Sequence, residues 1–208
     1  TIQLFETPMT TLLKIFLPIY FLLFFGLAMF WRSYIAWKRT GINPYKLGNG
    51  DTVHDFVGKL FRLTLIVAAL IVFVFSFLEG YYHWLSPITW MNSSTLIIIG
   101  IALLVLALIW VLVAQLQMGD SWRIGIDVKS ESALVQHGLF GVSRNPIFLG
   151  MLVMLVGMLL ILPTAATLTV SALGFVLIHV QVRLEEDFLV EKYGEDYRKY
   201  QMSVRRWI

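Results

Sequence analysis

Long apolar stretches alternate with short polar segments along the whole chain. A helix needs about 20 residues to cross the ~30 Å hydrocarbon core of a bilayer, and three mainly apolar stretches meet this need, residues 10–31, 58–79 and 94–117. A fourth apolar stretch, 147–182, is broken at Leu162-Pro163-Thr164. Because proline cannot continue a helix, the pattern predicts two further helices, 147–162 and 164–182, joined by a tight turn. The second of them is expected to continue past the membrane through Leu189.

The segments between these stretches are too polar to cross a membrane. Residues 40–57 are rich in turn-forming residues, residues 80–92 form a short aromatic connection, and residues 118–136 form a polar loop. The tail after residue 182 is amphipathic, and we expect it to be solvent-exposed. No linker is long enough to divide the chain, so residues 1–208 are expected to form one all-α membrane domain, a polytopic helix bundle.

Composition supports an integral membrane protein. Hydrophobic residues make up 58% of the 208 positions and charged residues 14%, whereas a soluble domain carries about a quarter charged residues. The chain has no cysteine, which excludes disulfides and thiolate chemistry. The net charge of +3 is typical of basic cytoplasmic loops in membrane proteins, so we expect membrane lipids and no nucleic acid among the partners.

The basic residues predict the orientation. Fifteen of the 16 lysines and arginines fall in three segments, 32–62, 118–146 and 183–208. Five spans, with the N-terminus outside and the C-terminus in the cytoplasm, place all three segments on the cytoplasmic side, as the positive-inside rule requires. Four spans, with 147–182 as one bent span, would separate 118–146 from the tail. We therefore expect five spans, the last two forming a hairpin, in the inner (cytoplasmic) membrane.

One polar cluster, Arg144-Asn145-Pro146, precedes the fourth predicted span. Proline suits the first turn of a helix. The unpaired N–H groups and positive dipole end there attract anions such as a carboxylate. The alternative is that Arg144 is an ordinary basic anchor at the membrane surface.

A second polar cluster, Glu185-Glu186-Asp187, follows the fifth predicted span. Acidic residues are unusual there, because the last turns of a helix favour cations. Neighbouring helical positions point about 100° apart, so Glu185 and Glu186 cannot face one pocket equally. On this geometry Glu186 shares a face with His179 and Arg183, and Glu185 lies beside Leu189. A solvated helix end is the alternative.

Glycines and histidines add little chemistry by themselves. Gly138, Gly141 and Gly150 do not form a dinucleotide-binding motif, and they are expected to allow close approach to a ligand or a helix. The four histidines lie on four separate segments without metal-ligand spacing, so we expect no metal site.

The order of these features along the chain resembles a known family. Residues 138–150 read Gly-Leu-Phe-Gly-Val-Ser-Arg-Asn-Pro-Ile-Phe-Leu-Gly, and an apolar hairpin separates them from Glu185-Glu186 and from Tyr193-Gly194, Tyr197 and Tyr200. This pattern is similar to that of the isoprenylcysteine carboxyl methyltransferases and the related phospholipid methyltransferases. The segment 40–44 also resembles bacterial members.

The resemblance implies an integral membrane enzyme that uses S-adenosylmethionine (SAM), with its cofactor pocket at the cytoplasmic face within residues 118–208. Carried over by position, residues 132–135, including Leu134 and Val135, line the adenosine side. Glu185 contacts the cofactor, and the catalytic positions are Arg144, which matches the family arginine, and Glu186, the neighbour of Glu185. The other positions implied to bind the cofactor are Gly138, Phe140, Asn145, Pro146 and Phe148.

This chain departs from the family pattern at three of these positions. Asn145 stands in place of histidine, and Phe140 and Phe148 stand in place of tyrosines. Asparagine can hydrogen-bond a cofactor but cannot act as a base near neutral pH. The substrate is therefore open: a lipidic or prenylated acceptor entering from the bilayer, methylated on a carboxylate, an amine or a thiol. The alternatives are an NADPH-dependent reductase related to the sterol reductases and a non-catalytic lipid-binding membrane protein.

Overall fold

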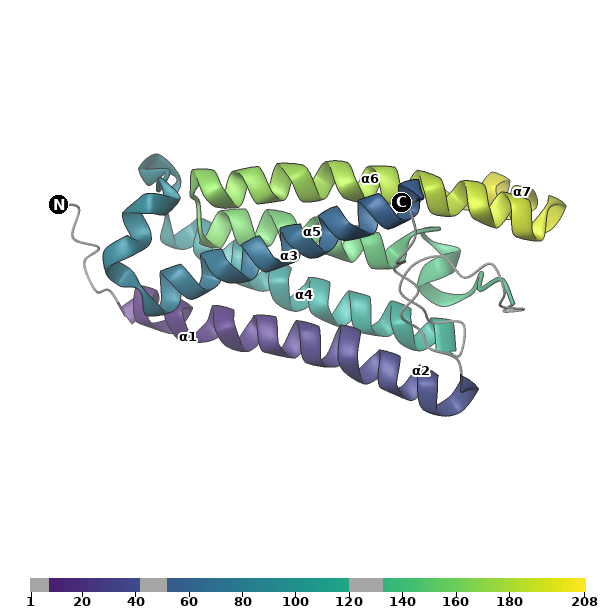
Figure 1. Cartoon of the computed structure of the whole chain (residues 1–208), viewed down its shortest axis with the longest axis horizontal. Helices are drawn as coiled ribbons and strands as arrows, with labels where there is room; N and C mark the ends of the chain where they lie inside the picture. Colours follow the sequence, from purple (N-terminus) through teal and green to yellow (C-terminus); the bar gives the residue numbers. More distant parts are fainter. Residues whose placement is uncertain (1–7, 42–51, 120–132) are drawn as a thin grey trace.

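The computed structural model describes residues 8–41, 52–119 and 133–208, and within them the regular structure is helical. Figure 1 shows a bundle of long, nearly aligned helices. The helices are α1 (Pro8–Leu23), α2 (Arg32–Thr40), α3 (Val53–Phe77), α4 (Ser94–Met118), α5 (Pro146–Ile161), α6 (Ala165–Tyr193) and α7 (Glu195–Ser203). A π-helix, η1 (Phe24–Trp31), joins α1 to α2 without a break, and short 3₁₀ turns occupy η2 (Glu79–Leu85), η3 (Thr89–Met91) and η5 (Gly138–Gly141).

Four helical segments of the described chain are long and apolar enough to cross a membrane: Pro8–Thr40, Val53–Phe77, Ser94–Met118 and Ala165–Tyr193. They confirm a helical integral membrane protein. The apolar helix α5 is shorter, with 16 residues. At 1.5 Å per residue it is about 24 Å long. It is therefore the one predicted span that is shorter than the ~30 Å hydrocarbon core.

Two predicted helix ends are wrong. The first helix was expected to end at Trp31, but it continues to Thr40. Its continuation is held by α4, because buried Arg32 donates from Nη2 to the Gln115 carbonyl at 2.6 Å, and Gln115 Nε2 donates to the carbonyl of Ala28 at 2.9 Å. The bond from Gln115 gives the Ala28 carbonyl a partner within η1, where the π-helical hydrogen-bond pattern differs from that of an α-helix.

The second predicted span begins earlier than residue 58. Helix α3 starts at Val53, because Thr52 and Asp55 form a capping box in which the Thr52 Oγ1 accepts from the Asp55 N–H at 3.2 Å. Such a pair satisfies two backbone donors at the helix start. The predicted loop 40–57 is therefore partly helical, and residues 42–51 of it lie outside the described residues.

Glycines bring α4 and α5 into close contact. A Cβ atom added at Gly150 would lie 2.6 Å from Val111 Cγ2, and one at Gly157 would lie 3.0 Å from the Gly100 carbonyl oxygen. Small residues at such positions let two membrane helices approach backbone to backbone. Gly150 thus serves helix packing, one of the two roles expected from the sequence.

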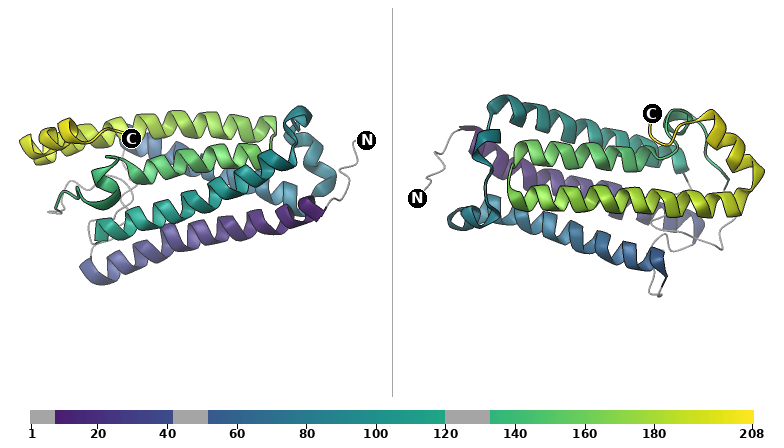
Figure 2. Two further views of the ribbon diagram at one scale, coloured as in Figure 1. Left: turned by 180° about the vertical axis from the view of Figure 1, so that it is seen from behind. Right: turned by 90° about the horizontal axis from the view of Figure 1, so that it is seen from above.

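The turns at one end of the bundle are tied together. The chain reverses at residues 162–164, and α5 and α6 lie side by side (Figure 2). The Ile88 N–H donates to the Pro163 carbonyl at 2.8 Å, and the Ala165 N–H donates to the Ser86 carbonyl at 2.9 Å. An ion pair of 2.9 Å between Lys14 and Glu79 joins α1 to the start of η2 at this same end.

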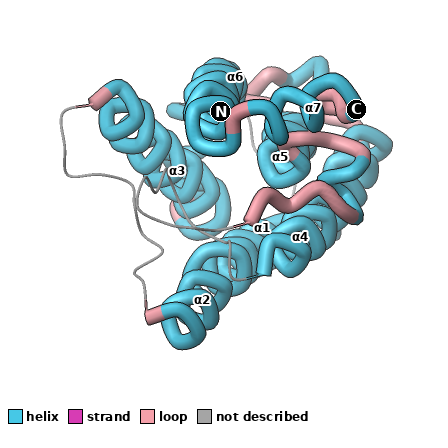
Figure 3. The backbone as a smooth tube through the Cα atoms, turned by 90° about the vertical axis from the view of Figure 1, so that its right-hand side faces the viewer, coloured by secondary structure: helices cyan, strands magenta, loops and turns pink. Residues whose placement is uncertain are grey.

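The opposite end of the bundle gathers the segments with the most polar residues. The end of α2, the start of α3, the end of α4, the start of α5 and helix α7 all lie there, and Figure 3 views the molecule from this end. The described parts of the basic segments identified in the sequence also lie toward this end. The helices between the two ends enclose an apolar core that includes Leu17, Phe75, Leu104 and Met158.

Candidate functional site

Glu186 lies at the centre of a polar cluster where α5 begins. It belongs to a buried stripe of α6 with four-residue steps, Ile178, Val182 and Glu186, and it is 2% exposed. A shared face would let Glu186 pair with His179 and Arg183, but the structure does not pair them. The helix packs along its i, i+4 ridge, and those two side chains instead bond carbonyls of α6 itself, at 2.9 and 3.0 Å.

Both carboxylate oxygens of Glu186 have partners. Oε1 accepts from Asn145 Nδ2 at 2.9 Å and from Arg144 Nε at 3.2 Å. Oε2 accepts from Arg206 Nη2 at 2.8 Å and Nε at 3.1 Å, and from Arg144 Nη2 at 3.3 Å. The two polar clusters of the sequence therefore meet in space, and an arginine from the chain end joins them.

Arg144 also holds the end of the chain. Its Nη1 donates to the carbonyls of Gln201 and Val204 at 2.9 and 2.8 Å. Its backbone N–H donates to the Arg205 carbonyl at 3.0 Å. A guanidinium has five N–H donors. The two carbonyls and the two carboxylate oxygens of Glu186 take four of them. Arg144 is thus fixed in place by the residues that surround it.

Residues 201–207 form a C-terminal strap across the segment before α5 (Figure 2). The expectation that the tail is solvent-exposed holds for Met202, Ser203 and Arg205, whereas the other residues of the strap are half-buried. Gly194, with φ +55°, lies between α6 and α7 where the chain changes direction. The strap then returns to the cluster, where Ser143 Oγ and Asn145 Nδ2 both donate to the Arg206 carbonyl at 3.3 Å. The Trp207 ring packs 5.1 Å from that of His179.

Helix α7 contributes two buried tyrosines. Tyr197 is 1% and Tyr200 is 3% exposed, and the Tyr200 hydroxyl donates to the Phe140 carbonyl at 2.6 Å. Burial raises the pKa of Tyr200 to about 12 and also raises the pKa of Tyr197. The hydrogen bonds to Glu186 raise the pKa of Arg206. All three groups therefore keep their protons at neutral pH.

The remaining predicted positions divide into two groups. Gly138, with φ +63°, leaves room for the Gln117 amide, whose Oε1 accepts from the Leu139 N–H at 2.8 Å. Pro146 opens α5 and its carbonyl accepts from Trp110 Nε1 at 2.8 Å. These two positions, with Phe140 and Asn145, border the cluster. The other group consists of half-buried side chains outside it, namely Leu134, Val135, Phe148 and Glu185, while Ser132 lies outside the described residues.

Sequence reasoning missed the part played by Arg206. Two signals pointed to it: three consecutive acids at 185–187 and two consecutive arginines at 205–206, in a chain with few charges. Opposite charges of that density are expected to pair wherever the fold brings them together. The tyrosines of α7 belong to the family-like spacing in the sequence, but that spacing does not indicate that they are buried.

The cluster brings two guanidinium groups together. Arg144 and Arg206 both contact the buried carboxylate of Glu186, and the carboxylate of Asp187 also lies close enough to act on Arg206. The N-terminus of α5 adds the positive end of a helix dipole beside them. The arrangement favours a neighbouring anion such as a carboxylate or a phosphate. Within residues 8–41, 52–119 and 133–208, no group of three or more His, Asp or Glu residues is placed to hold a metal ion.

Comparisons with known proteins agree with the resemblance found in the sequence. The family model described as phospholipid methyltransferase matches residues 95–196. The sequence matches no curated protein. The matched region begins with α4 and ends within α7, so it holds Arg144, Asn145 and Glu186 but not Arg206. The match to the phospholipid methyltransferase family thus covers the region from residue 95 to residue 196, which includes the centre of the polar cluster.

Proposed function

We propose that this protein is a SAM-dependent methyltransferase that methylates a lipidic or membrane-delivered acceptor. Family membership implies a membrane methyltransferase. The observation that supports a site at the start of α5 is the contact of Arg144 and Asn145 with Glu186, 41 to 42 residues apart in the chain. A cofactor pocket within residues 118–208 that uses both the segment before α5 and the part of α6 around Glu186 requires these residues to lie in contact.

The groups around the cluster suit the chemistry of SAM. The guanidinium groups of Arg144 and Arg206 and the N-terminus of α5 suit its carboxylate. Glu185, half-buried one position before Glu186, offers a second carboxylate for the ammonium group or the ribose hydroxyls. Leu134 and Val135, both half-buried, offer apolar surface for the adenine, and Gly138, Phe140 and Phe148 complete the proposed lining.

The residues of the cluster act by holding and orienting. When bound, the cofactor would supply an electrophilic methyl group. Glu186 fixes Arg144 and Asn145, which in turn present positive charge and an amide beside the pocket. In such a displacement the protein mainly aligns the reacting atoms in a dry site. A carboxylate or thiolate acceptor needs no base, and for an amine acceptor Glu185 is the carboxylate placed to take the proton.

Replacing Glu185 with glutamine is expected to weaken SAM binding by about 10- to 100-fold, since a hydrogen bond to a charged group contributes about 1.5–3 kcal/mol. Isothermal titration of the purified protein in detergent measures this. Asp187→Asn is the matched control, because Asp187 is exposed on the same helix and should leave the affinity unchanged. Wild-type protein that does not bind SAM at all, or equal affinities for the two variants, would contradict the proposed cofactor.

We also propose five spans, with α5 and α6 as a membrane hairpin, the N-terminus outside and the site at the cytoplasmic face of the inner membrane. The chain contains no cysteine, so single cysteines report cleanly on sidedness. In right-side-out vesicles an impermeant thiol reagent should label His83→Cys at once and Met202→Cys only after permeabilisation. Both positions are exposed. Five spans put them on opposite sides, whereas labelling from the same side would favour four.

A further inference from the structure

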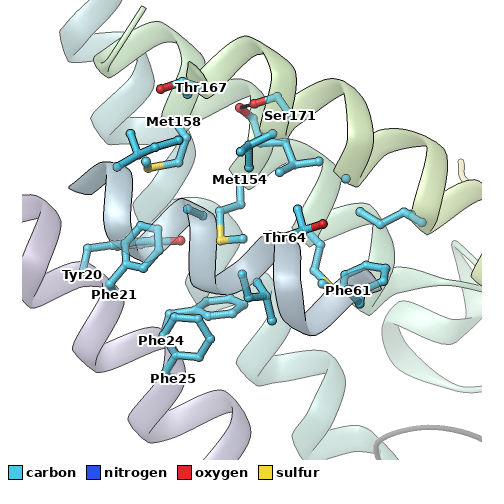
Figure 4. A pocket seen from close by; sticks show the side chains of 18 residues that line it. Tyr20, Phe21, Phe24, Phe25, Phe61, Thr64, Met154, Met158, Thr167 and Ser171 are labelled. Carbon is cyan, nitrogen blue, oxygen red and sulfur yellow. Dashed lines mark hydrogen bonds between the residues drawn. The ribbon is translucent and has the colours of Figure 1, made fainter. Parts of the chain in front are cut away.

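A narrow apolar slot runs between α1, α3, α5 and α6 (Figure 4). Four aromatic side chains of α1 and η1 form one wall, and three methionines of α5, Met151, Met154 and Met158, form another. The rest of the lining comes mainly from α3 and α6, including Gly174 of α6. Methionine walls adapt to ligands of varied shape.

One polar group of this slot has no partner. The Tyr20 side chain lines the slot, the residue is 3% exposed, and its hydroxyl makes no hydrogen bond among the described residues. The other lining hydroxyls are paired: Thr64 with the Leu60 carbonyl at 2.8 Å, and Ser171 with the Leu155 carbonyl at 3.4 Å, while Thr167 pairs with Thr164 at 3.0 Å. Leaving a buried hydroxyl unpaired is costly, so this hydroxyl points to a bound molecule with an electron-rich group.

The slot has the direction of a lipid chain. Its α6 wall extends from Thr167 to Ile178, about 16 Å at 1.5 Å per residue. It therefore lies parallel to the membrane-crossing helices, as lipid chains do. Ile178 precedes Glu186 by eight residues on α6, or about 12 Å. A chain lying in the slot would thus bring its head group toward the level of Arg144 and Asn145.

We propose that this slot binds one unsaturated hydrocarbon chain of the lipid that accepts the methyl group, with the Tyr20 hydroxyl donating to a carbon–carbon double bond. This inference rests on the proposed methyltransferase function. An O–H group can donate weakly to a π-system, and the aromatic wall favours flat, polarisable groups over a saturated chain. The slot selects the acceptor by its chain, whereas the polar cluster acts on its head group.

Photolabelling tests the slot independently of the head group. A long-chain fatty acid with a mid-chain diazirine is irradiated with the purified protein, and the labelled residues are mapped by mass spectrometry. Label is expected on the slot wall, at Met154 and its neighbours. Ala68→Phe, which fills the slot, should abolish that label. Val67→Phe is the matched control, because Val67 is 37% exposed on the same helix and does not line the slot.

Tyr20→Phe provides a variant that changes neither the volume nor the apolar packing. Oleic acid should displace the label from wild-type protein at an about three-fold lower concentration than stearic acid, and this difference should disappear in Tyr20→Phe. Label spread evenly over lipid-facing residues, or equal displacement by both acids in wild type, would overturn the proposal. SAM binding is titrated on the same samples. Slot labelling without SAM binding would overturn the assignment of the chain to a methyl acceptor, while SAM binding without slot labelling would overturn the slot alone.

Discussion

Replacing Glu186 with alanine is expected to destabilise the protein by about 3–5 kcal/mol, since removing one partner of a buried ion pair leaves the other charges uncompensated. The guanidinium groups of Arg144 and Arg206 would then face each other without the carboxylate that both now contact. The C-terminal strap would lose its ion pair to α6, and methyl transfer should be lost with it. Thermal unfolding in detergent measures the stability, and trypsin cleavage after Arg206 reports release of the strap.

Asp187→Ala is the control for this experiment. Asp187 is exposed on the same helix, and a surface substitution of this kind usually changes stability by less than about 0.5 kcal/mol. Glu186→Gln should lie between the two, because one carbonyl acceptor remains while the charge is lost. If Glu186→Ala unfolded with the control and its strap stayed protected, the cluster would not be what holds the chain end.

A bulky residue at Gly100 is the second change with a large expected effect. A Cβ atom there would lie 2.8 Å from the Gly157 carbonyl oxygen and 2.6 Å from Ile161 Cγ1. The carbonyl is backbone and cannot move aside, so Gly100→Leu must separate α4 from α5. Overpacking typically costs about 1–3 kcal/mol, and we expect the loss of stability at this position to lie at the upper end of that range or beyond. Helix α5 also carries Pro146 and the start of the site, so its displacement should disturb the site as well.

Gly26→Leu separates this packing effect from the general effect of leucine in a membrane helix. A Cβ atom at Gly26 meets nothing within 4 Å, so this variant should unfold at the wild-type temperature or above it. Gly100→Leu should unfold earlier and also bind SAM more weakly, since Arg144 and Asn145 are displaced together with α5. Equal unfolding temperatures for the two variants would show that the α4–α5 contact does not depend on glycine.

The centre of the candidate site could be predicted from the sequence because its chemistry is local. Arg144-Asn145-Pro146 and Glu185-Glu186 stand out in a chain with few charged residues, and the family match supports grouping them. The partner of Glu186 from the chain end could not be predicted in the same way. Arg206 lies outside the matched region, and its contact depends on the reversal at Gly194, which returns the strap to the start of α5.

The orientation of Glu186 on its helix shows a second limit of periodicity. Steps of 100° correctly separate Glu185 from Glu186, but they do not reveal which face a neighbouring helix covers. The structure places Glu186 in line with Ile178 and Val182, because packing follows the four-residue ridge that fits against the segment before α5. His179 and Arg183, expected on the same face, bond carbonyls of α6, and the His179 ring also packs against Trp207 of the strap.

The sequence by itself determined that this is a helical membrane protein, where most helices lie, and which polar residues matter. These follow from local physical chemistry: the hydrophobic effect marks the spans, proline marks the turn at 162–164, and charged residues are too costly in the bilayer to occur by chance. Only the tertiary structure decided that Gly150 serves the contact with α4, that Arg32 is buried against α4, and that the chain end closes over Glu186. Each of these depends on contacts between residues distant in the chain, whose geometry arises from packing and has no local sequence signal.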